Sequence, residues 1–79
     1  MSAEMFALYL RDLGDLVVRQ AVEAKEARLA ADPVDEQYSL GRLFAYHEVV
    51  SLMQQQADAF GLDRRALGLG DIDPDRDLL

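Results

Sequence analysis

The chain has no cysteine and no tryptophan, and it has a single histidine. Without cysteine, disulfide bonds are excluded, and so are thiolate nucleophiles and thiolate metal ligands; this composition fits a reducing compartment. A chain of 79 residues forms one domain at most, and its hydrophobic core is small. Because disulfides are excluded, we expect something else to complete the core, and a second subunit is the simplest means.

Basic residues are scarce. Eight Lys and Arg stand against 15 Asp and Glu, which gives a formal net charge of −7 at pH 7. Proteins that bind nucleic acid need the opposite balance, because Lys and Arg make the contacts with phosphate groups. Anionic lipid is disfavoured as a partner for the same reason. The acidic balance either serves solubility alone or favours a partner protein with a basic surface.

Long apolar runs are absent as well. No stretch approaches the roughly 20 apolar residues that a membrane-spanning helix needs. Acidic residues are spread through residues 1–30, and no apolar segment follows a basic start, so no secretory signal peptide is predicted. We therefore expect the protein in the cytoplasm of a bacterium, without a membrane partner.

Two long helical patterns fill most of the chain. Ser2 is the predicted N-cap of the first, and Glu4 lies in the first turn, where the helix dipole favours a negative charge. From about Ala3 to Ala31, apolar or small residues recur at the spacing of a helix that buries one face. The residues of this seam are Phe6, Leu10, Leu13, Val17, Ala21 and Ala24, with Tyr9 and Leu16 beside them.

The pair Asp32-Pro33 separates the two helices. Proline disfavours helical geometry at the residue before it, whereas Asp is a good N-cap and Pro suits the first helical position. The second helix is therefore predicted from about Pro33 to Phe60, with Gly61 just beyond its end. Two helices of similar length joined by a tight turn predict an all-α fold, an antiparallel helical hairpin.

Small residues face each other in this predicted hairpin. Antiparallel pairing about the turn places Gly14 opposite Ser51 and Gly41 opposite Ala24. Close approach of the helices at these points would offset the cost of about 1 kcal/mol that a glycine carries inside a helix. The alternative is that both glycines are simply tolerated.

Residues 62–79 are predicted to hold a short turn and an acidic tail, within the same single domain of residues 1–79. Asp63 is placed to cap one turn that ends at Leu67, and Gly68 and Gly70 break it. The tail from Asp71 to Leu79 is predicted to be extended or disordered. Its apolar residues, Ile72, Leu78 and Leu79, are nevertheless able to dock.

The segment His47-Glu48-Val49-Val50-Ser51 begins like H-E-x-x-H, the helical motif of zinc proteases. In that motif two histidines one turn apart bind zinc and the Glu acts as a base. Here Ser51 holds the place of the second histidine, so no zinc site is expected. A di-iron carboxylate bundle is disfavoured because Phe44 stands where its motif needs Glu. We predict no cofactor, no metal and no enzyme activity, because no nucleophile with a matching base and no phosphate loop is recognisable.

The second helix carries more apolar surface than one neighbouring helix covers. Its apolar residues span over half of the helix circumference, which is wider than an ordinary amphipathic stripe. A homodimer in which two hairpins pack as a four-helix bundle is the simplest way to bury it. The predicted dimer interface consists of Val49, Val50, Leu52 and Met53. The alternative is that the C-terminal turn folds back over the surplus within one chain.

An aromatic residue on an acidic background marks a candidate protein-binding site. Leu40 and Phe44 interrupt the polar side of the second helix, and residues 32–60 carry five acidic residues against Arg42 alone. Charge steers a basic partner and an aromatic anchor supplies affinity. The predicted partner-binding residues are Asp35, Glu36, Leu40, Phe44, His47 and Glu48.

The segment LGRLFAYHEVVSLMQQQADAFGL lies at the centre of this short, acidic, cysteine-free and all-helical chain. In size, charge and architecture the chain resembles the small immunity proteins of bacterial toxin–immunity pairs. The resemblance implies a non-enzymatic inhibitor that binds a cognate toxin, a basic protein in this interpretation, and occludes it. Two alternatives stay open: a structural or adaptor homodimer without an inhibitory role, and a carboxylate metal-binding helical bundle.

Overall fold

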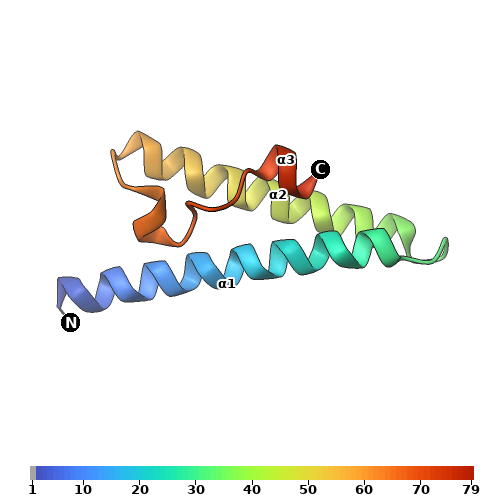
Figure 1. Cartoon of the computed structure of the whole chain (residues 1–79), viewed down its shortest axis with the longest axis horizontal. Helices are drawn as coiled ribbons and strands as arrows, with labels where there is room; N and C mark the ends of the chain where they lie inside the picture. Colours follow the sequence, from blue (N-terminus) through green and yellow to red (C-terminus); the bar gives the residue numbers. More distant parts are fainter. Residues whose placement is uncertain (1) are drawn as a thin grey trace.

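A computed structural model describes residues 2–79, and these residues form an all-helical structure. The elements are α1 (Ala3–Ala30), α2 (Glu36–Ala59), the 3-10 helix η1 (Arg64–Leu67) and α3 (Pro74–Leu78). Helices α1 and α2 run antiparallel as a hairpin, and the chain then returns along one side of it (Figure 1). The predicted all-α hairpin with a short C-terminal helical turn is therefore confirmed. Within residues 2–79, neither long helix has a stretch apolar enough to cross a bilayer.

The N-terminus of α1 is capped as the sequence predicts. The Ser2 hydroxyl oxygen accepts a hydrogen bond from the Met5 amide at 3.2 Å, and Glu4 lies in the first turn. The helix ends at Ala30, because Ala31 has extended backbone angles of φ −70° and ψ 137°. The end of α1 thus falls one residue before the predicted one, ahead of the Asp32-Pro33 pair that disfavours helix.

Helix α2 begins three residues later than predicted. Residues 33–35 form a tight turn in which the Asp35 amide donates to the Asp32 carbonyl at 2.9 Å. The first helical hydrogen bond runs from the Ser39 amide to the Asp35 carbonyl, so Asp35, not Asp32, is the N-cap residue. The Asp35 side chain makes no capping hydrogen bond.

The end of α2 follows the prediction closely. Gly61 has a positive φ of 68°, which glycine adopts without steric cost. The Leu62 amide donates to the Ala57 carbonyl at 2.8 Å and the Gly61 amide donates to the Asp58 carbonyl at 3.0 Å. This pair of hydrogen bonds is a Schellman motif, and it turns the chain back toward the hairpin.

The acidic tail is ordered, which corrects the prediction of an extended or disordered segment. Asp73 caps α3, because its carboxylate accepts hydrogen bonds from the amides of Asp75 and Arg76 at 3.1 and 3.3 Å. The side chains of Ile72 and Leu78 are buried, Leu78 completely. Apolar burial at these two positions outweighs the polarity of the residues around them, so the segment packs on the hairpin.

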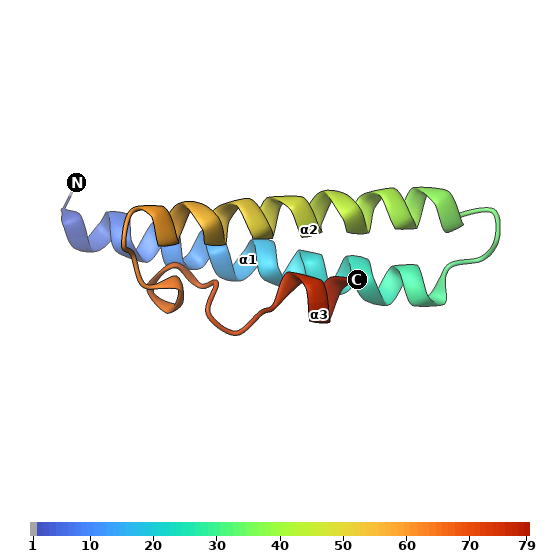
Figure 2. The same ribbon diagram turned by 90° about the horizontal axis from the view of Figure 1, so that it is seen from above.

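The core lies between the hairpin and the returning tail. Its buried members come from all three parts of the chain, and they are Ala21 and Ala24 of α1, Leu43 and Val50 of α2, and Ile72 and Leu78 of the tail. Gln54 secures the tail from α2, since its side-chain amide donates to the carbonyls of Leu69 and Ile72 at 3.0 and 2.8 Å. Figure 2 shows the tail running along one side of the two helices.

The predicted pairing of small residues across the hairpin is wrong. Gly14 is buried, but it faces the backbone of Leu67 and Gly68 rather than Ser51. Gly41 has no neighbour within 4 Å of the position that a Cβ would take. Gly14 therefore allows a close approach between α1 and η1, and neither glycine marks the place where the two long helices meet.

Candidate functional site

The residues predicted to bind a partner lie along one side of α2 and its N-terminal turn. Phe44 is 47% exposed, and Asp35 and Glu48 are exposed. Glu36 is also exposed and accepts a hydrogen bond from the Arg28 guanidinium at 3.4 Å. Leu40 is half-buried. Phe44 and these acidic side chains are therefore accessible on the surface of the molecule.

His47 lies where the tail meets α2. Its Nε2 is 2.7 Å from a carboxylate oxygen of Asp75, and its side chain is 20% exposed. The hydrogen bonds of residues 2–79 include none between His47 and Ser51. The side chains of His, Asp and Ser are therefore not joined in the relay that a serine hydrolase uses. His47 fastens α3 to α2 at the edge of the predicted site.

No metal-ligand cluster forms around His47. Among residues 2–79, no group of three or more His, Asp or Glu side chains is placed to hold a metal ion. Ser51, which holds the place of the second histidine, lines a polar groove of about 320 Å³ together with Arg64, Asp73 and Asp75. The groove is lined by one guanidinium group and two carboxylates, and this combination does not form a metal site.

Two ion pairs involve side chains of the returning chain. The Arg64 guanidinium donates two hydrogen bonds to the Asp58 carboxylate, at 3.0 and 2.7 Å. These hydrogen bonds lower the pKa of Asp58 and raise the pKa of Arg64. Likewise, the hydrogen bond from the Arg76 side chain, and after it one from the Asp73 amide, lower the pKa of Asp77 to about 2. All of these carboxylates are charged at neutral pH.

The residues predicted for a dimer interface separate into two groups. Val49 and Leu52 are exposed, Leu52 by 64%, and Met53 is half-buried. Val50 is 0% exposed, because it belongs to the core that the tail completes. Val50 therefore lies inside the single chain and offers no surface to a second copy.

A larger apolar surface lies on the side of the hairpin away from the tail, and the sequence pattern does not predict most of it. The name apolar face is used here for seven side chains that are each between 39% and 70% exposed. They are Phe6, Tyr9, Leu13 and Leu16 of α1, Val49 and Leu52 of α2, and Phe60 just beyond the end of α2. The periodicity of α1 predicts that its whole seam is buried. The N-terminal half of the seam is exposed, because α1 and α2 diverge toward the open end of the hairpin (Figure 1).

A groove of about 240 Å³ opens at one end of this apolar face. Its walls are almost entirely apolar and come from α1, α2 and the segment around η1, with Leu10, Met53 and Leu67 among the lining residues. The groove exists because η1 packs against Gly14 while α1 and α2 are splayed apart at this end. Apolar grooves of this kind receive side chains of a binding partner more readily than polar ligands.

The chain matches no family model, no curated protein and no solved structure. The candidate sites therefore rest on the residues and geometry of this chain alone.

Proposed function

We propose that this protein is a non-enzymatic protein-binding module whose partner carries a basic surface. The observation that carries the proposal is Phe44, an aromatic side chain half exposed on α2 with the acids Glu36 and Glu48 on the same helix. Aromatic anchors supply a large share of the affinity of protein interfaces, and complementary charge accelerates association. The net charge of −7 adds to that steering.

Within this class, the proposed role is inhibition by occlusion, as in the immunity or antitoxin proteins of toxin pairs. Its support is the resemblance in size, charge and helical architecture, together with a binding surface on rigid helix. The partner of such an inhibitor is a basic toxin, and its active surface is covered when the acidic side of α2 docks.

The proposal includes pairing of two chains into a four-helix bundle. The second candidate function, a structural or adaptor homodimer, is favoured by the same apolar surface that supports pairing. In an adaptor, the pairing of two chains would itself be the function, and no salt-sensitive basic partner would exist.

The test compares a charge-reversed variant with a matched control. The first variant carries Asp35→Lys, Glu36→Lys and Glu48→Lys; the control carries Glu4→Lys, Asp12→Lys and Glu26→Lys, which change the net charge equally from α1. The bait is the tagged full chain, and the partner that it retains is purified and titrated at several salt concentrations. We expect the first variant to lose binding and the control to keep most of it.

Phe44→Ala tests the aromatic anchor separately. Its partner affinity is expected to fall by about tenfold or more, since anchors at interface centres contribute over 1 kcal/mol. Circular dichroism first checks that each variant folds. Equal affinity of the parent, the charge-reversed variant and Phe44→Ala across the salt series would rule out this surface as the site.

A further inference from the structure

The apolar face is too large for a surface that only meets water. Its exposed area is on the order of 600 Å², since each large apolar side chain has roughly 150–200 Å² of surface and is about half exposed. An apolar patch of this size is at the upper end of what monomers expose, and patches of that size often mark interaction sites. The area is also close to the roughly 800 Å² that each partner contributes to a standard interface.

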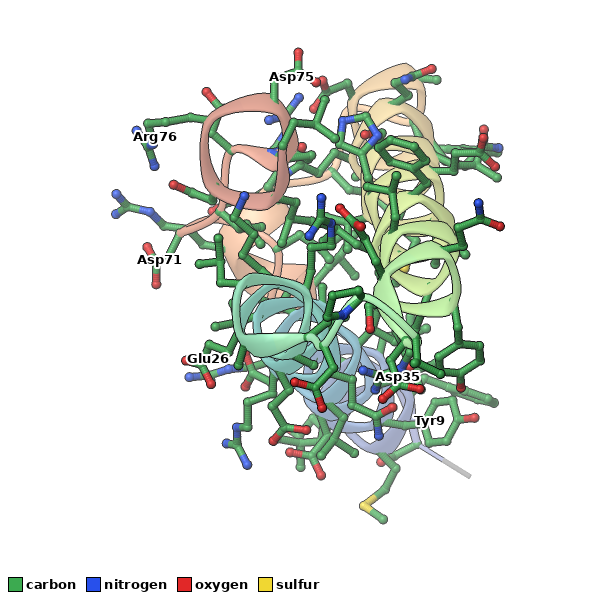
Figure 3. The ribbon with its side chains drawn as sticks, turned by 90° about the vertical axis from the view of Figure 1, so that its right-hand side faces the viewer. Tyr9, Glu26, Asp35, Asp71, Asp75 and Arg76 are labelled. Carbon is green, nitrogen blue, oxygen red and sulfur yellow. The ribbon has the colours of Figure 1, made fainter. Side chains whose placement is uncertain are left out.

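The apolar face lies opposite the tail. The positions that contact the tail and η1, such as Gly14 and Val18 on α1 and Gln54 on α2, lie on the other flank of each helix at 100° per residue. In Figure 3, Tyr9 points away from the hairpin on the side opposite α3, whereas Asp71, Asp75 and Arg76 project from the tail itself. The tail therefore leaves this flank of both helices uncovered.

Charge selects the kind of partner that fits. From Val49 to Phe60 the only charged residue of α2 is Asp58, and it turns to Arg64 on the tail side. On α1, Arg11 and Asp15 face the groove beside Gly68, which leaves Asp12 at the margin of the apolar face. The acids nearest to the apolar face are Asp12 and the exposed Glu48, both at its margin, so a second apolar surface fits this face better than a strongly basic one.

We propose that a second copy of this chain docks on the apolar face, hairpin against hairpin, with both tails on the outside. The inference rests on the pairing proposed above and assigns it a surface: the open half of the hairpin, with α1 contributing as much as α2. Each chain carries a net charge of −7, and this arrangement limits the repulsion between two chains because the acidic tails lie on opposite outer sides of the dimer. The open groove beside Met53 is covered by the second copy.

Phe44 lies outside this interface. It is separated from Val49 and Leu52 on the helical circumference of α2 and borders the tail side. A dimer formed in this way presents two separate partner-binding surfaces, one on each chain. Leu52 and Leu16 therefore test pairing, and Phe44 tests partner binding.

The test measures the mass of the full chain by sedimentation equilibrium from low micromolar to several hundred micromolar concentration. The parent is expected to have twice the 8.8 kDa of one chain. Leu52→Glu and Leu16→Glu place a carboxylate in the apolar face, and each substitution acts twice in a two-fold interface. The dissociation constant of each variant is expected to rise at least a hundredfold.

The matched control is Leu8→Glu. The exposed fraction of Leu8, 59%, is similar to that of Leu52, 64%. Leu8 lies on the η1 side of α1, however, beside Ala66. The control is expected to remain dimeric, and circular dichroism checks that all variants keep the parent helicity. Dimeric Leu52→Glu and Leu16→Glu, or a monomeric Leu8→Glu, would overturn the assignment of the face while leaving pairing intact. A parent that is monomeric at every concentration would overturn both, without bearing on the binding tests at Phe44.

Discussion

Individual glycines decide how closely the parts of this molecule approach one another. At Gly14 the α1 backbone lies against the carbonyl of Leu67, so close that a Cβ would overlap it. At Gly68 the φ angle is 71° and a Cβ would meet the backbone of Arg11 and Asp15. The position of η1 on α1 therefore depends on two glycines, Gly14 on α1 and Gly68 at the end of η1.

Gly14→Ala is expected to destabilise the fold by about 1–3 kcal/mol, because overpacking at a buried contact outweighs the better helix propensity of alanine. Gly41→Ala is the matched control, since Gly41 lies inside α2 with open space around it. This control is expected to be neutral or up to about 1 kcal/mol more stable. Urea unfolding followed by circular dichroism measures both values. Equal free energies of unfolding for the two variants would contradict the contact between Gly14 and η1.

Asp77 gives the tail a defined response to acid. Its pKa of about 2 lies below the ordinary value of 3.8, so the folded state prefers the charged form. The stabilisation is complete above the ordinary pKa and is lost as pH falls from about 4 to about 2. Carbon-13 NMR titration of the Asp77 carboxyl is expected to give a midpoint near 2 in the parent. In Arg76→Gln the midpoint should rise toward 3.8, and an unchanged midpoint would remove Arg76 as the cause.

At the scale of elements, the tail is held by a few contacts that are far apart in sequence. Leu78 and Ile72 bury their side chains, and Gln54 donates to two tail carbonyls. The Lys25 ammonium donates to the Leu79 carbonyl at 2.8 Å and fastens the end of the chain to α1. The tail thus forms a third layer on the hairpin although its own helix, Pro74–Leu78, is only 5 residues long.

Gln54→Met is expected to loosen the tail while leaving the hairpin formed. Methionine has a similar volume, but it leaves two buried carbonyls without a donor, which costs about 1–3 kcal/mol each. Gln55→Met is the control, because Gln55 is exposed and donates no such bond. Hydrogen exchange of the amides of residues 69–78 is expected to accelerate in Gln54→Met only. Parent-like exchange in that variant would show that apolar burial alone secures the tail.

At the scale of the whole molecule, a chain of this size leaves much of its apolar surface outside its own core. The structure is long and thin, with extents of 48 × 23 × 16 Å, and such a shape has a large surface for its volume. The tail covers one flank of the hairpin and leaves the other as the apolar face. The proposed pairing with a second copy would stabilise such a fold by mass action.

The midpoint of thermal unfolding is therefore expected to rise with protein concentration in the parent. In Leu52→Glu the dependence should disappear, because that variant is expected to be monomeric over the same range. Calorimetry at several concentrations, spanning about a hundredfold, measures the effect. A parent midpoint that does not move with concentration would indicate that the single chain is the complete folding unit.

The sequence by itself determined the two long helices and, within three residues, their ends. The periodicity of residues 3–31, the cap at Ser2, the break at Pro33 and the stop at Gly61 are local signals, since each depends on neighbours within one or two turns. The predicted start of α2 is three residues too early. A proline fits both the first position of a helix and a turn just before a helix, so the local sequence does not distinguish the two. The sequence alone also shows that no second histidine follows His47 by one helical turn.

Only the tertiary structure decided which apolar residues are core and which are surface. Val50 and Leu52 belong to the same apolar sequence pattern, yet Val50 is buried against the tail and Leu52 is 64% exposed. Likewise, Phe6 and Ala24 belong to one seam of α1, but the helices diverge and leave Phe6 uncovered. The cause is the return of residues 62–79, whose docking depends on contacts such as Gly14 with Leu67 and Gln54 with Ile72. Those contacts join residues far apart in sequence, and no local pattern encodes them.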